Sequence, residues 1–138
     1  MNRGLLLDTC AIIWMANGDN IAIAAENAVN SVVADGGELC VSAISAWEIG
    51  MLSSRRRLPI TKDALAWFEE FVSAGEITVK DATPSVLVAA SFLPTPLHND
   101  PMDRIIIATA REHDLTIITR DRAILAYGAA GYVKTLAC

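Results

Sequence analysis

Short, uninterrupted apolar runs alternate along this chain with longer segments of helical periodicity. The first run, residues 4–7 (Gly-Leu-Leu-Leu), stops at Asp8, which is typical of a strand that is buried on both faces. Because helices of about ten or more residues separate successive runs, the strands must be joined by crossovers, which connect parallel strands. We therefore predict an α/β fold with three layers, in which helices flank a mainly parallel central sheet.

The boundaries of these elements follow from apolar spacing, from glycine and proline positions and from helix caps. Strands are predicted at residues 4–7, 38–41, 77–79, 115–118 and 132–136. Helices are predicted at residues 9–16, 21–34, 42–52, 61–74, 83–93, 100–113 and 121–127. Thr83-Pro84 and Asp100-Pro101 each place a capping side chain before a proline at the first helical position.

Length and composition limit the class of protein. A chain of 138 residues suffices for one core, and we predict a single domain over residues 1–138. Hydrophobic residues make up 53% and charged residues 20%, which favours a compact chain over a disordered one.

No apolar run approaches the ~20 residues of a membrane helix. Asp8 also ends the first apolar run well short of the length of a signal-peptide core, so a cytoplasmic protein is expected. The three cysteines have no CxxC spacing, which argues against a disulfide framework or a zinc knuckle.

The overall charge restricts how the protein handles nucleic acid. Its net charge is −5 and its pI is near 4.9, which disfavours binding through bulk positive charge. A polyanionic substrate would have to be managed at a local site, with the help of a cation.

Four acidic residues are expected at one edge of the sheet. In an open parallel sheet, ligands bind outside the carboxyl ends of the strands. Asp8 directly follows the first strand, and Asp121 lies three residues after Ile118. Asp103 belongs to the first turn of the helix that starts at residue 100, and Glu48 lies one to two turns into the helix that follows residues 38–41.

Each acid also fits a purely structural role. Asp100 fits either a metal ligand or an N-cap whose side chain accepts from the backbone N–H of Met102 or Asp103, and the sequence does not choose between them. Residues 45–48 (Ser-Ala-Trp-Glu) fit a capping box, and acids in the first turn of a helix are favoured by the helix dipole.

The acids are more informative as a set than singly. Four carboxylates at one partly buried edge repel one another by amounts of kcal/mol unless a cation neutralises them. All-oxygen ligation without histidine or thiolate suits Mg²⁺ or Mn²⁺ rather than zinc. One or two such ions can activate water and stabilise a leaving oxygen, so that hydrolysis of a phosphodiester needs no protein nucleophile.

Four segments in a fixed order carry a resemblance to a known family. They are residues 6–9 (LLDT), 42–49 (SAISAWEI), 100–110 (DPMDRIIIATA) and 118–121 (ITRD). Together they resemble the motifs of PIN-domain ribonucleases of the VapC toxin type, and they span nearly the whole chain. The resemblance implies a PIN-like fold and a metal-dependent endoribonuclease that is the toxin of a type II (VapBC) toxin–antitoxin pair. It also implies an RNA substrate, a homodimer and inhibition by a VapB-like antitoxin.

The family's acidic site carries over onto matching positions of this chain. The resemblance implies catalytic and metal-binding roles for Asp8, Glu48, Asp103 and Asp121, with Asp100 matching the first acid of the third motif. Thr9 and Thr119 match small hydroxyl residues beside that site. Cys10 departs from the pattern, because such proteins often carry a polar residue there.

Other classes of protein also place acids at strand ends. A dehalogenase-like phosphatase needs Asp-x-Asp after its first strand, whereas this chain has Asp8-Thr9-Cys10. A receiver-like signalling domain needs adjacent acids there and an aspartate after its third strand, which residues 77–81 match poorly. A catalytically silent PIN-like binding module keeps the fold without the activity, and only an assay separates it from the nuclease.

Several residues outside the acidic set have open roles. Residues 55–57 (Arg-Arg-Arg) fit a solvated connector or a contact with RNA phosphates, and Arg104 fits a partner for a neighbouring acid or for phosphate. His98 is expected to be a loop residue without metal-ligand spacing. Helix surface at 21–33 and at 65–71 is more apolar than one small sheet can cover, which predicts an interface.

Overall fold

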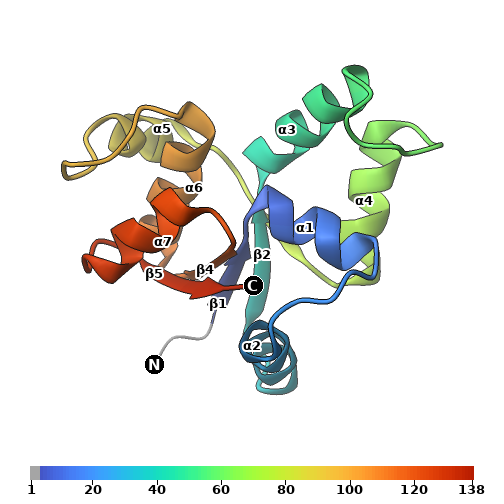
Figure 1. Ribbon diagram of the computed structural model, residues 1–138, viewed down its shortest axis with the longest axis horizontal. Helices are drawn as coiled ribbons and strands as arrows, with labels where there is room; N and C mark the ends of the chain where they lie inside the picture. Colours follow the sequence, from blue (N-terminus) through green and yellow to red (C-terminus); the bar gives the residue numbers. More distant parts are fainter. Residues whose placement is uncertain (1–3) are drawn as a thin grey trace.

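A five-stranded sheet forms the centre of the computed structural model, which describes residues 4–138. The strands are β1 (Gly4–Leu7), β2 (Glu38–Ser42), β3 (Thr78–Lys80), β4 (Thr116–Thr119) and β5 (Lys134–Ala137). Their order across the sheet is β3-β2-β1-β4-β5, and all four pairings are parallel. The predicted parallel α/β class is confirmed (Figure 1).

The helices fill the connections between the strands. They are α1 (Thr9–Ala16), α2 (Ile23–Ala34), α3 (Ala43–Ser54), α4 (Ala64–Ala74), α5 (Pro84–Ser91), α6 (Pro101–His113) and α7 (Arg122–Ala129). Most observed ends lie within one to three residues of the predicted ones. The predicted capping box at residues 45–48 is wrong: Ser42 caps α3 by accepting from the backbone N–H of Ile44 at 3.1 Å, which leaves Ser45 inside the helix.

Both faces of the sheet are covered, which explains the uninterrupted apolar runs. Along β1, Leu6 belongs to one core cluster, and Leu5 and Leu7 belong to the other. The first cluster includes buried residues of α5, α6 and α7, and the second includes buried residues of α1, α2, α3 and α4. In Figure 1, α5, α6 and α7 lie to the left of the sheet, whereas α1 and α4 lie to the right.

The strand order places a switch point next to β1. The chain first adds β2 and β3 on one side of β1 and later adds β4 and β5 on the other side. Such a point, outside the carboxyl ends of the strands, is where open α/β sheets bind ligands. The order also differs from the 2-1-3-4-5 order of a receiver domain, so the receiver-like alternative is wrong.

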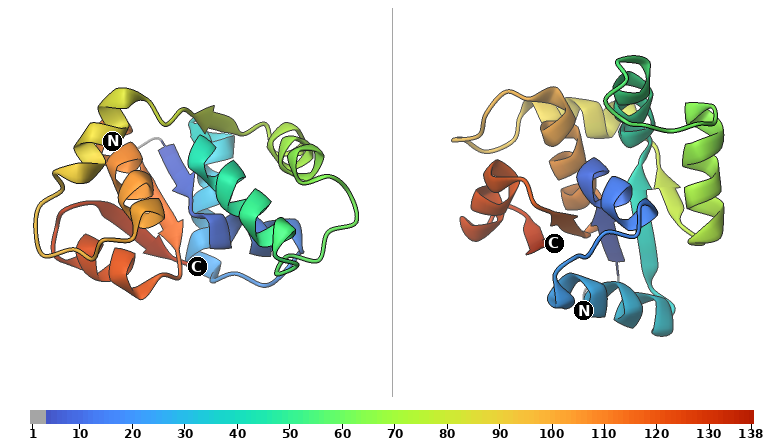
Figure 2. Two further views of the ribbon diagram at one scale, coloured as in Figure 1. Left: turned by 90° about the horizontal axis from the view of Figure 1, so that it is seen from above. Right: turned by 45° about the vertical axis from the view of Figure 1, so that its right-hand side comes forward.

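Four helices begin at this edge of the sheet. α1, α3 and α7 each start within three residues of the carboxyl end of a strand, and α6 starts there because it runs back toward the beginning of β4. α3 and α6 contact each other across the end of β1 (Figure 2). Since the amino end of a helix carries partial positive charge, the fold creates an edge that favours carboxylates.

No helix within residues 4–138 is long and apolar enough to cross a membrane.

Candidate metal centre

Asp8 is the most deeply placed acid at this edge. It directly follows β1 and caps α1, and only 7% of its surface is exposed. Its Oδ1 atom accepts from the backbone N–H of Thr9 at 2.8 Å, and its Oδ2 atom accepts from the Thr119 hydroxyl at 2.7 Å. The carboxylate therefore serves as a helix cap and faces the end of β4 at the same time.

Thr119 connects Asp8 with Asp121. Its buried hydroxyl donates to Asp8 and accepts from the backbone N–H of Asp121 at 2.9 Å. Asp121 in turn caps α7, because its Oδ1 atom accepts from the backbone N–H of Ile124 at 3.0 Å. One hydroxyl thus fixes the positions of two acids that come from neighbouring strands.

The amino end of α6 supplies two further acids. Asp100 accepts from the backbone N–H groups of Met102 at 2.9 Å and of Asp103 at 3.2 Å, so its predicted role as an N-cap is confirmed. A role as a metal ligand stays a prediction. Asp103 is partly buried, and its Oδ2 atom lies 3.0 Å from Nε2 of His98.

Glu48 approaches the centre from α3. Electrostatic interactions link its carboxyl to Asp8 and Asp100. The Thr9 hydroxyl donates to the buried Ser45 hydroxyl at 2.9 Å, which ties α1 to the turn of α3 that carries Glu48. Sequence patterns singled out Thr9 but not this role of Ser45, because the contact joins two helices that are distant in the chain.

The carboxyl groups raise one another's pKa values. The pKa of Asp103 is raised to about 7, mainly by burial and then by the charges of Asp121, Asp100 and Asp8, against a smaller opposing effect of His98. Burial also raises the pKa of Asp8, although hydrogen bonds from Thr119 and Thr9 and the nearby Cys10 thiol act against it. The centre therefore favours the binding of positive charge, either protons or a cation.

Burial is the main cause that raises the pKa of the Glu48 carboxyl as well, with smaller contributions from the charges of Asp8 and Asp100. The Thr9 hydroxyl opposes this rise. Glu48 is thus subject to the same repulsion as the acids on the other helices.

The donor set fits a divalent cation. One ligand atom each of His98, Asp103 and Asp121 lie within 4.8 Å of one another, close enough for a single ion to touch them. Asp8 and Glu48 are outside this trio but add oxygen donors and negative charge beside it. Oxygen-rich ligation of this kind suits Mg²⁺ and Mn²⁺.

His98 was predicted to be only a loop residue, and it does lie in the loop between α5 and α6. Its contact with Asp103 depends on how the loop folds back over the start of α6, which residue spacing does not reveal. Two roles were open for Arg104, as a partner for a neighbouring acid or for phosphate. It donates instead to the backbone carbonyl oxygens of Ala90 at 2.9 Å and His98 at 3.0 Å, so the pairing with an acid is wrong, whereas a contact with phosphate stays a prediction.

Cys10 lies at the edge of the centre, and its thiol is not a reactive one. Its Sγ atom is 3.6 Å from Oδ2 of Asp8, and burial together with the Asp8 charge raises the pKa of the thiol to about 12. Cys10 therefore stays a protonated thiol near neutral pH, and it donates to the carboxylate weakly instead of ligating a cation.

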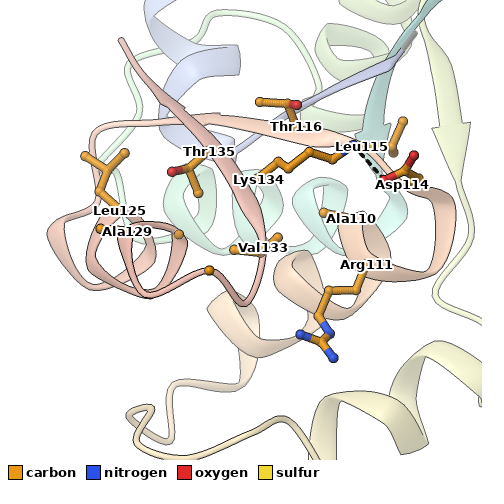
Figure 3. A pocket seen from close by; sticks show the side chains of 12 residues that line it. Ala110, Arg111, Asp114, Leu115, Thr116, Leu125, Ala129, Val133, Lys134 and Thr135 are labelled. Carbon is orange, nitrogen blue, oxygen red and sulfur yellow. Dashed lines mark ion pairs between the residues drawn. The ribbon is translucent and has the colours of Figure 1, made fainter. Parts of the chain in front are cut away.

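A cavity of about 690 Å³ lies away from the acids. It is found between α6, α7 and the first residues of β4 and β5, where Lys134 pairs with Asp114 at 2.6 Å (Figure 3). Because strands begin at that edge, the cavity lies at the opposite end of the sheet from Asp8 and Asp121. It has no part in the chemistry of the acidic centre.

Comparisons with known proteins agree with this fold. Residues 5–129 match the family model of the PIN domain. Ribonuclease VapC22 of Mycobacterium tuberculosis is 36% identical over 121 residues, which cover 87% of this chain and 88% of that relative. Two toxin–antitoxin structures share the fold. VapBC2 of Rickettsia felis, bound to a DNA fragment from its promoter, has a TM-score of 0.69 at 14% identity and covers 97% of this chain and 98% of its own. VapBC-5 of M. tuberculosis has a TM-score of 0.61 at 16% identity and covers 99% of both chains.

Proposed function

Because this chain belongs to the PIN-domain family, we propose that it is a metal-dependent endoribonuclease and the toxin of a VapBC-type toxin–antitoxin pair. One observation carries the proposal: Asp8, Asp103 and Asp121 interact electrostatically where three helices begin at the switch point of the sheet. The ribonuclease relative supports the choice of RNA as substrate. We also propose that the protein acts in the cytoplasm, where it would meet RNA.

The proposed site consists of Asp8, Glu48, Asp103 and Asp121, with Asp100 as a further candidate. These residues would hold one or two divalent ions, Mg²⁺ or Mn²⁺. When bound, such an ion supplies Lewis-acid activation of water and of the phosphodiester. We also propose that residues 1–138 form one PIN-like domain, since the family match covers most of the chain and both core clusters share one sheet.

The residues of the chain prepare this site before substrate arrives. Thr119 and the backbone N–H of Thr9 hold both oxygen atoms of Asp8, so little reorganisation is needed to bind a cation. Asp103, with a pKa of about 7, gives up its proton when positive charge is bound beside it. The partial positive charge at the helix amino ends offsets part of the repulsion within the cluster.

RNA cleavage by the purified, antitoxin-free protein tests the activity. We expect cleavage with Mg²⁺ or Mn²⁺ and none with EDTA. Asp8→Asn should abolish cleavage without unfolding the chain, because asparagine can still cap α1 but carries no charge. Asp19→Asn is the matched control, since Asp19 is an exposed acid at the far end of α1. Cleavage by folded Asp8→Asn would remove this residue from the site, and no cleavage under any condition would favour the silent binding module.

Exposed apolar side chains support the proposed partners. The predicted apolar surface is partly buried, since Phe68 lies in the core, but Leu65 stays 60% exposed. A groove of about 480 Å³ lies beside Leu65, lined by Ala43, Ala46, Phe68, Glu69, Val72, Ser73 and Val79. We assign this surface to an antitoxin whose chain lies along the groove. A basic antitoxin side chain that reached the acids would neutralise them and so couple binding to inhibition.

A second exposed apolar surface lies away from that groove, on α5 and just after it. It contains Val88, which is 60% exposed, and Phe92, which is 81% exposed, and we assign it to the proposed homodimer. Light scattering at micromolar concentration, with and without a co-expressed antitoxin, tests both contacts. A strictly monomeric chain that binds no antitoxin would remove the toxin–antitoxin part of the proposal and leave the nuclease part standing.

A further inference from the structure

We propose that His98 is a positioning residue that orients the Asp103 carboxylate for the cation, and that Arg104 holds His98 in place for this task. The inference rests on the proposed metal-dependent function and adds two residues to it. Neither residue was predicted to act in this way.

Two contacts define which nitrogen atom of His98 donates. Its Nδ1 atom accepts from the backbone N–H of Asp100 at 3.3 Å, so Nδ1 must present its lone pair there. The proton of the neutral ring therefore lies on Nε2, which is 3.0 Å from Oδ2 of Asp103. Donation from Nε2 occupies one oxygen atom of Asp103 and leaves its other oxygen atom to face a cation.

The same contacts argue against His98 as a direct metal ligand, although one of its ring nitrogen atoms lies within 4.8 Å of ligand atoms of Asp103 and Asp121. Ligation through Nε2 would move the ring proton to Nδ1. Two N–H groups, those of Nδ1 and of Asp100, would then point at each other. The observed arrangement is that of an outer residue that orients a metal-binding carboxylate by a hydrogen bond.

Arg104 and Tyr127 hold the loop that carries His98. Arg104 follows Asp103 directly in α6, and its guanidinium donates through Nε to Ala90 of α5 and through a terminal nitrogen to the carbonyl oxygen of His98. The Tyr127 hydroxyl of α7 donates to the carbonyl oxygen of Pro94 at 2.6 Å. The loop is thus held by side chains of two helices, α6 and α7, and α6 carries both the oriented acid and the arginine that anchors its partner.

Binding of Mn²⁺ to the purified protein, measured by calorimetry, tests the inference without reference to catalysis. We expect His98→Ala to weaken Mn²⁺ binding by about 10- to 100-fold, as the loss of an orienting partner does at other metal sites. His98→Gln should bind within a few fold of the wild type, because its amide N–H can replace the Nε2 donor. His113→Ala is the matched control, since His113 is the chain's other histidine and lies at the far end of α6.

A double-mutant cycle tests the part of Arg104. Arg104→Lys cannot reproduce two donors in a fixed fork, so it should weaken Mn²⁺ binding as well. When combined with His98→Ala, it should add little further loss, because the two residues act in one chain of contacts. Fully additive losses would overturn the role of Arg104 as the residue that positions His98.

Three results would overturn the role of His98. The first is Mn²⁺ binding by His98→Ala that equals the wild type, and the second is equal weakening by the Ala and Gln variants. The third is a strong ¹⁴N coupling in the electron paramagnetic resonance of the Mn²⁺-loaded wild type that His98→Ala abolishes, because it would make His98 a direct ligand. If the wild type itself bound no Mn²⁺, the proposed function would fail together with this inference, whereas the other outcomes leave that function intact.

Discussion

Asp103→Asn should have opposite effects on stability and on activity. The pKa of this carboxyl rises from its ordinary 3.8 to about 7 in the folded chain, mainly through burial and then through the charges of Asp121, Asp100 and Asp8. The folded state therefore holds a proton that the unfolded chain has already lost. Stability should fall as the pH rises from about 4 through about 7, and the full shift corresponds to about 4 kcal/mol.

Asparagine removes the charge and keeps an oxygen atom that can accept from Nε2 of His98. In EDTA at pH 8, we expect Asp103→Asn to be about 1 to 4 kcal/mol more stable than the wild type. The difference should shrink toward pH 4.5, where the wild-type carboxyl is protonated. RNA cleavage should nevertheless be lost, because the variant lacks a charge that binds the cation.

Urea unfolding of the chelated proteins at several pH values measures this effect directly. Asp19→Asn should keep the wild-type dependence on pH, since it changes an exposed acid away from the cluster. Parallel stability curves for the wild type and Asp103→Asn between pH 5 and pH 8 would refute the reasoning, because they would mean that burial and the neighbouring acids do not raise the pKa of Asp103 in the folded chain.

Three other predictions concern the surroundings of this acid. Asp100→Ala should cost about 0.5 to 2 kcal/mol of stability through loss of the cap on α6, as thermal melting can measure; a large loss of cleavage by Asp100→Asn without a change in melting would instead identify a metal ligand. Thr119→Val should destabilise the chain by about 1 to 3 kcal/mol in urea unfolding, because it removes the hydroxyl donor to Oδ2 of Asp8 and the acceptor for the N–H of Asp121, whereas Thr119→Ser should keep most of that stability. Millimolar Mg²⁺ should raise the melting temperature more than Na⁺ at matched ionic strength, with about 2.7 kcal/mol gained when the free ion exceeds its Kd 100-fold, and equal effects of the two salts would contradict a preformed site.

Local patterns in the sequence determined the elements and their parallel arrangement. The apolar run at residues 4–7 required a strand with two covered faces, and the packing of Leu5 and Leu6 on opposite faces confirms it. Asp100 before a proline specified the start of α6, because capping and a fixed proline φ act within one turn of helix. The sequence likewise placed Asp8 and Asp121 near strand ends, since Asp8 directly follows one apolar run and Asp121 lies a few residues after another.

Only the tertiary structure decided which of these ends are neighbours. Asp8 and Asp121 share the hydroxyl of Thr119 because β4 pairs with β1, and that pairing depends on how helices cover both faces of the sheet rather than on any local pattern. The contact of His98 with Asp103 and the hydrogen bond from Arg104 to the carbonyl oxygen of His98 likewise depend on the packing of separate elements. Spacing along a chain encodes periodicity and caps, but contacts between separate elements are selected by the packing of the whole core.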